Sequence, residues 1–588
     1  SGNYMLFEYI EEGGEAWISK ISYTGNTAAS QLPYNSIEFV YTTSANNPGK
    51  KMVYEGGGEI NLDRLLDYIL VKCESNQIKK YDMVYSGTQD IRLTEVVEYG
   101  RDNSNFNSTF IEWNPLVSTI STQTLNLGQY LYSTSGDFNN DGFSDLAYTT
   151  SGTNWNWNIR LGSASGLEST VYSGSGPDYI KGMASGDYDN DGKDELFFFT
   201  AETQTLFTEQ SYLIYNFENN TLVYSAGGLI ASSDKLNAQV VDLTGDGEDQ
   251  YGMNDYVIYT EQGVVMESYP VNPSAFPAGL VFGSRDFAFD FNANGKADIV
   301  QIDAINNRIS VYEYNSLSSS FDVLVSNFQT YDFDNAMPGD FNGDGRGDLL
   351  MMYQGIEYIY YSTGKEFRYY DGNSVNEGSY VTGNNSISND YALAVQDFNG
   401  DGNSDIITLK QEYHYEFELS HWSNDLRLYN YFSNSFDGSS LQSDFNNDMY
   451  TSFINYGDTN SSPWDPSRAV FGDFNGDGKM DIATESTLYF FMDQDKGKTV
   501  KRIYNGLNDY VEFNYNTLAQ DNEYVTDSVA APYIAFNYPM QKVYSVVVPD
   551  GLGSTNQTWF NYAQGALHPE LGFVGFGKIS SKNSLNIK

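Results

Sequence analysis

The stretch GDFNGDGRGDL, residues 339–349, decides the fold expected for this chain. Acidic or amide residues stand at alternate positions, a glycine follows, and an apolar run begins after Asp348. Close copies recur as GDFNNDGFSDL (136–146), GDYDNDGKDEL (186–196), FDFNANGKADI (289–299), QDFNGDGNSDI (396–406) and GDFNGDGKMDI (472–482), with a degenerate copy, VDLTGDGEDQ, at 241–250. A motif repeated at a period of roughly 50 residues is typical of a repeat architecture.

The intervals between the copies predict a β-propeller. The motifs start at Asp137, Asp187, Asp242, Asp290, Asp340, Asp397 and Asp473. Each interval holds about four short strand candidates, and four strands per unit is the blade of a β-propeller. Seven motifs therefore predict seven blades over residues 118–505, with an insertion around 433–466 in the long last interval.

The two flanks lack the motif but are also predicted to be β structure. Residues 1–117 hold short alternating runs such as YMLFEYI (4–10), which favour antiparallel strands and a β-sandwich-like domain. RLLDYILV (64–71) is expected to be a strand for the same reason. Residues 506–588 are predicted to be a further β-rich segment. The fold class is all-β. The chain opens on Ser1 and stops after a strand candidate, so we expect a processed protein or part of a longer one.

The repeated motif, D-x-[DN]-x-[DN]-G-x-x-[DE], has the composition of a calcium loop. Positions 1, 3, 5 and 9 supply oxygen atoms, and the glycine at position 6 permits a tight turn. This predicts about six structural Ca²⁺ sites. The side-chain ligands would be Asp137, Asn139, Asp141, Asp145, Asp187, Asp189, Asp191, Glu195, Asp290, Asn292, Asn294, Asp298, Asp340, Asn342, Asp344, Asp348, Asp397, Asn399, Asp401, Asp405, Asp473, Asn475, Asp477 and Asp481. The degenerate copy has Thr244 and Gln250 at ligand positions and is expected to be weak or empty.

Two alternatives to this calcium loop can be weighed from the sequence. An EF-hand begins in the same way but needs a glutamate at position 12 and flanking helices. Position 12 is Tyr148 in the first copy and Met351 in the fifth, and strand-like residues follow, so the EF-hand is rejected. A calcium-free turn stabilised by Asp and Asn side chains remains open.

The net charge of −47 excludes a nucleic-acid partner, because binding a phosphate backbone needs clustered Lys and Arg. The 49 Tyr and 36 Phe residues favour β structure. No apolar run approaches the roughly 20 residues of a transmembrane helix, and no signal peptide is visible.

No catalytic constellation stands out. The three histidines, His414, His421 and His568, have no spacing typical of a zinc site, and Cys73 has no histidine nearby in sequence. No nucleophile elbow or phosphate-binding loop is present. We therefore predict no catalytic residues, no organic cofactor and no enzymatic activity.

Two short features invite a binding interpretation. Arg346-Gly347-Asp348 spells an integrin-recognition tripeptide, but Asp348 is also position 9 of a loop and is expected to face inward. Trp155 and Trp157 suggest a sugar-stacking platform, for which packing within a strand is the simpler explanation.

The motif copies resemble the FG-GAP/VCBS repeats of integrin-α-like propellers. That resemblance covers roughly 118–505, and it implies a seven-bladed propeller with structural Ca²⁺ in β-hairpin loops.

The flanks resemble the SpvB and toxin-complex B-component family, which is related to Rhs-repeat proteins. The matching residues are Tyr538-Pro539, Asp550-Gly551-Leu552-Gly553 and Gly572-Phe573-Val574-Gly575-Phe576. In that family the propeller docks on a membrane-translocating component, and an Rhs-type shell encloses a C-terminal toxic polypeptide. This chain shows no such shell or toxic domain.

The resemblances imply a non-enzymatic scaffold of a secreted or surface-exposed bacterial virulence protein. It would dock to a translocation component or the secretion machinery and gate or carry a toxic cargo. The alternatives are an adhesin or lectin-like propeller that binds protein or glycan, and a polysaccharide-cleaving propeller enzyme.

Overall fold

The structure is a computed structural model of the 588-residue chain. It describes residues 2–584 except 13–14, 43–50, 56–57, 63, 88–90, 115–117, 129, 151–155, 176–178, 188–190, 202–209, 218–220, 230–237, 244–249, 254–255, 262–263, 271–286, 304, 319, 331–334, 354–355, 370–379, 383–385, 398–403, 415–420, 430, 435–441, 446–453, 456–468, 494–498, 508, 526–532 and 569–571.

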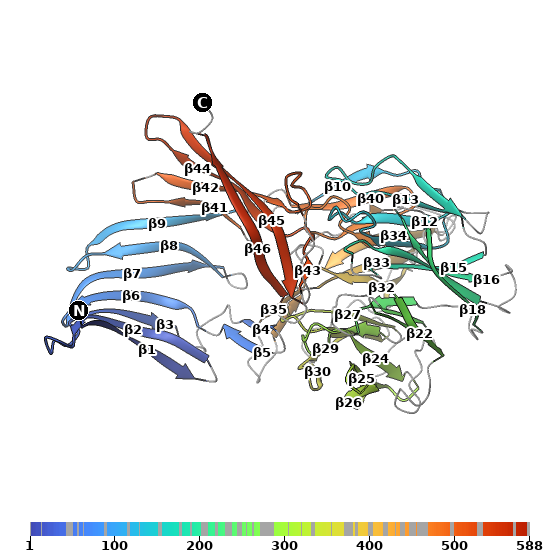
Figure 1. Cartoon of the computed structure of the whole chain (residues 1–588), viewed down its shortest axis with the longest axis horizontal. Coiled ribbons are helices and arrows are strands. Elements are labelled where there is room, and N and C mark those ends of the chain that lie inside the picture. Colours follow the sequence, from blue (N-terminus) through green and yellow to red (C-terminus); the bar gives the residue numbers. More distant parts are fainter. Residues whose placement is uncertain are drawn as a thin grey trace.

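The described chain is built from β-strands, which confirms the all-β class. A large sheet lies on one side of the molecule, and a ring of smaller sheets lies on the other (Figure 1). Over the residues described, no helix has the length and apolarity needed to cross a membrane.

The large sheet has 13 strands and joins the two ends of the chain. Its order is β1-β2-β3-β6-β7-β8-β9-β41-β42-β44-β45-β43, with β46 also paired to β45. The strands from the first part are β1 (Asn3–Glu12), β2 (Glu15–Asn26), β3 (Asn35–Tyr41), β6 (Leu66–Cys73), β7 (Asn76–Ser86), β8 (Arg92–Tyr99) and β9 (Asn105–Trp113). Those from the last part are β41 (Val500–Tyr504), β42 (Tyr510–Thr517), β43 (Ile534–Ala535), β44 (Gln541–Pro549), β45 (Thr555–His568) and β46 (Gly572–Asn583). The strand predicted at 64–71 is confirmed by β6.

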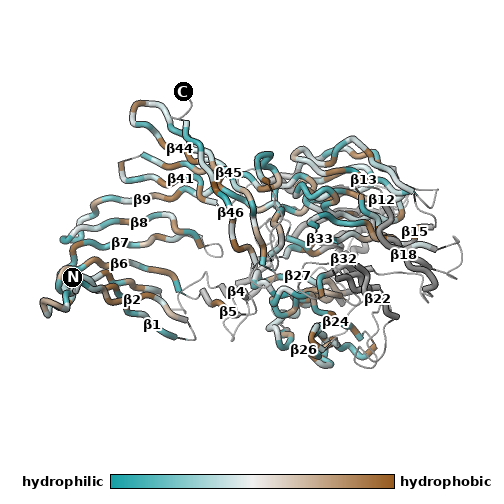
Figure 2. Tube along the Cα trace, in the orientation of Figure 1, coloured by the Kyte–Doolittle hydropathy of each residue, from teal (hydrophilic) through white to brown (hydrophobic). Residues whose placement is uncertain are grey.

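The expected β-sandwich over residues 1–117 is wrong. Apart from the hairpin β4 (Lys51–Glu55) and β5 (Gly58–Leu62), the strands of this region lie in one sheet rather than two packed sheets. Hydrophilic and hydrophobic residues are interspersed along these strands (Figure 2), and most side chains are only half-buried. Alternation of this kind predicts strands but not their partners, and here the partner of β9 is β41.

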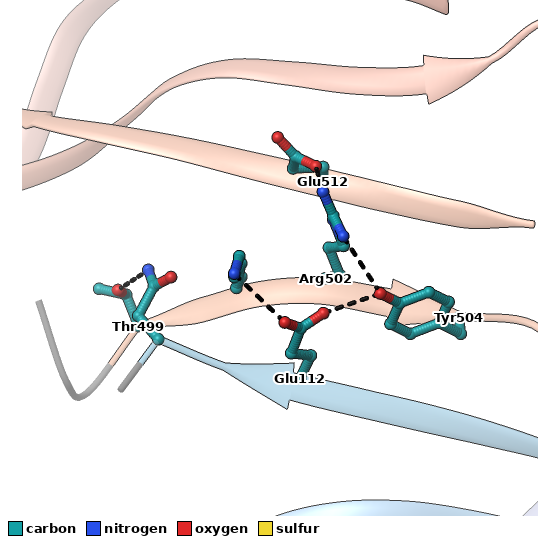
Figure 3. Close-up of polar contacts among 7 residues, drawn as sticks. Glu112, Thr499, Arg502, Tyr504 and Glu512 are labelled. Carbon is teal, nitrogen blue, oxygen red and sulfur yellow. Dashed lines mark hydrogen bonds and ion pairs between the residues drawn. The ribbon is translucent and has the colours of Figure 1, made fainter. Parts of the chain in front are cut away.

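Side chains reinforce the junction between β9 and β41 (Figure 3). Tyr504 Oη donates a hydrogen bond to Glu112 Oε2 at 2.8 Å. Arg502 Nε donates to Glu512 Oε2 at 2.6 Å on the next strand, β42. Together these contacts join three neighbouring strands, one from the first part of the chain and two from the last.

Five four-stranded sheets follow one another in chain order and confirm the predicted β-propeller. They are β11 (Ser133–Gly136), β12 (Asp145–Thr149), β13 (Asn156–Arg160) and β14 (Tyr172–Ser175); β15 (Tyr179–Gly186), β16 (Glu195–Ala201), β17 (Gln210–Asn216) and β18 (Thr221–Leu229); β19 (Ala238–Val241), β20 (Gln250–Met253), β21 (Tyr256–Glu261) and β22 (Val264–Pro270); β23 (Phe287–Phe289), β24 (Asp298–Asp303), β25 (Arg308–Asn315) and β26 (Ser320–Gln329); and β27 (Asn335–Gly339), β28 (Asp348–Tyr353), β29 (Ile356–Ser362) and β30 (Phe367–Tyr369). Seven such regular blades were predicted, and five are found, because the remaining two repeats form sheets of a different construction.

One of these sheets has five strands, and the other combines distant parts of the chain. The five-stranded sheet contains β31 (Tyr380–Thr382), β32 (Ser386–Gln396), β33 (Asp405–His414), β34 (His421–Tyr429) and β37 (Ile454–Asn455). The composite sheet has the order β10 (Ser118–Thr124), β40 (Thr487–Asp493), β39 (Asp481–Ala483) and β38 (Val470–Gly472). In the chain, the hairpin β35 (Tyr431–Asn434) and β36 (Gln442–Phe445) lies between β34 and β37 and overlaps the predicted insertion, and most of 433–466 lies outside the described residues.

The propeller core lies between neighbouring sheets. One buried cluster contains Val300 and Ile309 of one sheet together with Leu349 and Met351 of the next. A second joins the first regular blade to the composite sheet through Tyr148 and Leu488, among other residues. Because each blade is covered on both faces, a strand such as β12 is buried at every position.

Candidate metal-binding loops

In the five regular blades the repeated loops connect the first and second strands. Loop 6 connects β32 and β33 of the five-stranded sheet, and loop 7 connects β38 and β39 of the composite sheet. We number them by repeat: loop 1 (137–145), loop 2 (187–195), loop 4 (290–298), loop 5 (340–348), loop 6 (397–405) and loop 7 (473–481). Loops 1, 4, 5 and 7 are described throughout. Asp189 of loop 2, Asn399 and Asp401 of loop 6, and residues 244–249 of the degenerate third copy lie outside the described residues.

The carboxylate at position 1 organises each loop. In loop 5, Asp340 Oδ2 accepts a hydrogen bond from the amide of Gly345 at 2.8 Å, and Oδ1 accepts one from Asp344 at 3.2 Å. Equivalent bonds from the position 6 glycine are found at Asp137, Asp187, Asp290 and Asp473, with lengths of 2.7–2.8 Å. The glycine at position 6 has a positive φ, +88° at Gly345, which explains its recurrence.

The carboxylate at position 9 is the most deeply buried group. Asp145, Asp298, Asp348, Asp405 and Asp481 all have 0% exposure. Asp348 Oδ2 accepts a hydrogen bond from the amide of Phe341 at 3.0 Å, and Oδ1 accepts one from Ser362 at 2.8 Å. This carboxylate therefore ties the loop to the end of β29, a role that the sequence pattern did not indicate.

Positions 3 and 5 form a second layer of turns. Asn342 Oδ1 accepts a hydrogen bond from the Asp344 amide at 3.0 Å, and Asn342 Nδ2 donates to Asp344 Oδ2 at 2.9 Å. Asp344 Oδ1 in turn accepts one from the Arg346 amide at 2.9 Å. These are the Asp and Asn turns that the sequence left open as an alternative to calcium binding.

Burial raises the pKa of the loop carboxyls. In loop 5 it raises the pKa of Asp340 to about 7, with the neighbouring Asp344 charge as the next cause, and that of Asp344 to about 6. In loop 1 burial raises the pKa of Asp137 to about 7 and that of Asp145 to about 9. Each loop thus gathers carboxyl groups whose negative charge is poorly stabilised by the protein itself.

The donor chemistry of the loops fits a hard divalent cation. Carboxylate and amide oxygens are the ligands that Ca²⁺ prefers. Asp298 Oδ1 is buried and has no hydrogen-bond partner within the described structure, so one oxygen of loop 4 is available to a cation. As the side chains lie, however, no three Asp, Glu, His or Cys groups of the described chain converge in a metal-coordinating arrangement. The calcium ligands remain a prediction.

Position 8, whose role the sequence pattern did not indicate, links neighbouring loops at five places in the described structure. Its backbone amide donates to the carbonyl oxygen at position 1 of the neighbouring loop. The residue type at position 8 differs from copy to copy, so the sequence does not reveal the backbone hydrogen bond that these positions share. The bonds are Asp194 to Asp137 (2.9 Å), Ala297 to Asp242 (2.8 Å), Gly347 to Asp290 (2.7 Å), Ser404 to Asp340 (2.6 Å) and Ser144 to Asp473 (2.9 Å).

At several loops, the residue just before the loop and position 8 of the next loop are one small and one larger residue, whereas Gln396 and Met480 are both large. Where a glycine precedes the loop, as at Gly339, position 8 is a polar side chain, and Ser404 Oγ accepts a hydrogen bond from the Asp340 amide at 2.9 Å. Where Phe289 precedes the loop, position 8 is Gly347, and a methyl group there would lie 2.0 Å from the Phe289 ring. The sequence signal for this contact is the recurring combination of one small and one larger residue at these two positions.

The structure also places the RGD tripeptide and one of the two tryptophans that suggested a binding function. Arg346 is 6% exposed and Asp348 is 0% exposed, so the RGD tripeptide is buried as expected. Trp157 is 2% exposed and stacks on Phe198, with ring centroids 5.9 Å apart, whereas Trp155 lies outside the described residues. The packing interpretation of Trp157 is therefore correct.

Of the three histidines and the cysteine, two histidines are neighbours, and the other two residues lie in the large sheet. His414 and His421 are register partners in the β33–β34 hairpin, closer than their sequence separation suggested. His568 lies in β45 of the large sheet, with its ring 5.7 Å from that of Tyr533. Cys73 ends β6 and is a half-buried free thiol.

Comparisons with known proteins agree with both resemblances. Residues 137–198 match a family model described as an FG-GAP-like repeat, and residues 455–586 match one described as the insecticide toxin TcdB middle/N-terminal region. The FG-GAP and toxin-complex resemblances are thereby confirmed. The chain has no significant match among curated proteins.

Several solved structures are similar to this chain over half of its length or more. A crystal structure of TcdB2-TccC3 is 13% identical, with a TM-score of 0.46, and the match covers 99% of this chain and 28% of that one. The Dos1 propeller is 8% identical over 60% of this chain and 86% of its own, with a TM-score of 0.25. A luciferin-regenerating enzyme is 9% identical over 50% of this chain and 88% of its own, with a TM-score of 0.26. The chain thus spans about 28% of the length of TcdB2-TccC3.

Proposed function

We propose that this chain is a non-enzymatic scaffold of a secreted toxin-complex protein, in which the propeller docks on a translocation partner. The observation that carries the proposal is the match of residues 455–586 to the TcdB middle/N-terminal region, which begins within the last part of the propeller and continues through the strands that complete the large sheet. The FG-GAP-like match at residues 137–198 lies in the same propeller. In this proposal the same assembly contains a toxic cargo, and the propeller gates or carries that cargo.

The large sheet is suited to a scaffold role. It ties the first 113 residues to the last part of the chain through the β9–β41 pairing. The propeller is inserted between these two halves, so both of its ends are anchored in the same sheet. A partner that binds the propeller would therefore be linked to the large sheet through both ends of the propeller.

We further propose a seven-bladed ring in which the five-stranded and composite sheets are the sixth and seventh blades. Support comes from the innermost strands, since β11 neighbours both β15 of the next blade and β38 of the composite sheet. The bond from Ser144 of loop 1 to Asp473 of loop 7 repeats the contact made between consecutive loops. The first and last repeats thus relate to each other as neighbours do.

Calcium in about six of the loops is the third part of the proposal. Its support is the oxygen-only donor set and the buried carboxyls with raised pKa values. A bound Ca²⁺ would neutralise these charges and rigidify the loop between the first two strands of each blade. Its role would be structural, holding the propeller in the shape that a partner recognises.

The docking proposal can be tested directly. The full natural protein that contains this sequence would be mixed with the A-type toxin component encoded in the same genome, and binding measured by biolayer interferometry with and without Ca²⁺. We expect a stable complex that weakens on chelation. No binding in either condition, together with specific hits on a glycan array, would favour the lectin-like alternative instead.

A further inference from the structure

The propeller is connected to the large sheet at two separate places. The first is the pair of chain crossings, from β9 to β10 and from β40 to β41. Asn114 and Thr499 hold these crossings together: the Asn114 amide donates to the Thr499 carbonyl oxygen at 3.0 Å, and Asn114 Nδ2 donates to Thr499 Oγ1 at 2.9 Å. Two adjacent strands alone would let the propeller turn relative to the sheet.

The second connection comes from the segment between β42 and β44. We call its described residues, 517–525 and 533–540, the latch segment. Gln520 Nε2 donates to the carbonyl oxygen of Asn475 in loop 7 at 3.2 Å, and Thr517 Oγ1 donates to that of Gly476. Asn537 Nδ2 donates to the carbonyl oxygen of Asn140 in loop 1 at 2.7 Å. The latch segment therefore bridges the first and last loops of the ring.

The contact surface is close as well as polar. A methyl group added at Gly142 of loop 1 would lie 2.5 Å from the Asn537 carbonyl oxygen, and one at Gly476 would lie 3.0 Å from Ala519 Cβ. Thr517, Leu518 and Ala519 are all buried, with at most 8% exposure. The latch segment thus packs directly against loops 1 and 7.

The latch segment is held firmly on its other side by the large sheet. Lys542 of β44, with a side chain 2% exposed, forms an ion pair with Asp521. Thr517, at the end of β42, also pairs with Gln541 of β44. The amide of Leu518 donates to the carbonyl oxygen of Met540 at 3.0 Å, which joins the two described parts of the latch segment. The segment therefore moves with the sheet, and its contacts with loops 1 and 7 set the orientation of the propeller.

We infer that residues Thr517, Gln520 and Asn537 form a releasable latch that fixes the propeller against the large sheet at the closure of the ring. The polar contacts with the propeller are hydrogen bonds to the backbone carbonyls at positions 3 and 4 of loops 1 and 7 and to Asn140 Oδ1. They are weak compared with the strand pairing on either side, so they can open while both domains stay folded. Opening leaves the Asn114–Thr499 crossing as the hinge.

The test compares a latch variant with a matched control by distance measurement. Spin labels are placed at Leu552→Cys, 91% exposed in the large sheet, and Leu317→Cys, 99% exposed in the propeller, in a Cys73→Ser background. The latch variant is Gln520→Ala with Asn537→Ala. The control is Asn583→Ala, which removes a side-chain hydrogen bond to Thr558 within the large sheet.

We expect the distance distribution between the labels to broaden in the latch variant and to stay unchanged in the control. Hydrogen exchange supplies the second readout: the Gly142 and Gly478 amides of loops 1 and 7 should exchange about tenfold faster, while Gly345 of loop 5 keeps its rate. A latch variant with the same distance distribution and the same exchange rates as the parent would overturn the inference. So would equal acceleration in all three loops, because that would indicate general destabilisation.

Discussion

The backbone amide of Ser144 donates to the carbonyl oxygen of Asp473 at 2.9 Å, and Ser144 Oγ accepts a hydrogen bond from the Asp473 amide at 3.0 Å. These residues are 329 positions apart, yet the pair repeats the bonds that Ser404 makes with Asp340 in adjacent repeats. The first and last repeats are therefore joined by the same contact that joins the repeats of Asp340 and Ser404.

Removing the closing hydroxyl should destabilise the propeller. We expect Ser144→Ala to lower the free energy of unfolding by about 1 kcal/mol, because the Asp473 amide loses its side-chain acceptor in a half-buried site. Urea denaturation measures the change. Ser165→Ala, an exposed serine whose hydroxyl contacts Ser163, is the control and should have no measurable effect. Equal stability of the Ser144 variant and the parent would contradict the closing role.

The pairing of Gly347 with Phe289 should appear as energetic coupling. Gly347→Ala places a methyl group against the Phe289 ring and should cost about 1–3 kcal/mol through overpacking. In a Phe289→Ala background the same change should cost almost nothing, since the ring has been removed. A double-mutant cycle in urea measures the coupling. Additive effects would show that the two positions do not constrain each other.

Calcium should stabilise the protein through loop 5 among others. A ligand that binds only the folded state at 100 times its dissociation constant adds about 2.7 kcal/mol, so chelation should lower the melting temperature. Asp344→Ala should remove one bound Ca²⁺ from the stoichiometry measured by calorimetric titration, because alanine supplies no side-chain oxygen at position 5. Asp509→Asn, on the exposed turn between β41 and β42, is the control and should keep the parent stoichiometry. An unchanged melting curve in EDTA would refute calcium binding.

Without metal, stability should fall as pH rises. The folded-state pKa values of Asp137, Asp340 and Asp473 are raised to about 7, and those of Asp298 and Asp145 to about 8 and 9, chiefly by burial. A raised pKa contributes stability that is complete below the unfolded value near 4 and is lost as pH rises through the folded value. Each carboxyl that stays protonated contributes a slope of about 1.4 kcal/mol per pH unit.

Urea unfolding in EDTA at pH 5, 6, 7 and 8 measures this trend. High salt serves as the control for the net charge of −47, because it screens surface repulsion but not buried groups. The stabilisation by added Ca²⁺ should grow over the same interval, because the metal displaces protons from its ligands. A chelated protein that is equally stable at pH 5 and pH 8 in high salt would count against buried, protonated carboxyls.

The ion pair between Lys542 and Asp521 should be worth far more than a surface pair. Lys542→Met leaves a buried carboxylate without its partner and should cost about 3–5 kcal/mol. Lys79→Met breaks the half-exposed pair with Glu98 and should have a much smaller effect, because solvent screens that pair. Thermal and urea unfolding compare the two variants. Similar costs would show that water reaches the Lys542 site.

Much of the propeller was predictable because its determinants are local. The period of the acidic motif and the strand candidates that follow it predicted a propeller, and Asp340 and Gly345 form the tight turn expected at the motif glycine. The inward position of Asp348, and with it the burial of the RGD tripeptide, followed from the loop alone. The role of position 8 was missed, because Ser144, Asp194 and Gly347 share a backbone contact rather than a side chain.

The sequence by itself determined the strands, the loops and their order, since period-2 alternation and turn residues act over a few residues. Only the tertiary structure decided the partners. It paired β9 with β41, so that one sheet replaced the expected sandwich, and it joined β10 to β40 and Ser144 to Asp473 to close the ring. Such choices depend on which distant edges and buried faces meet, and local patterns do not record this. The same holds for Asn537, an ordinary loop residue in the sequence that the fold places against loop 1.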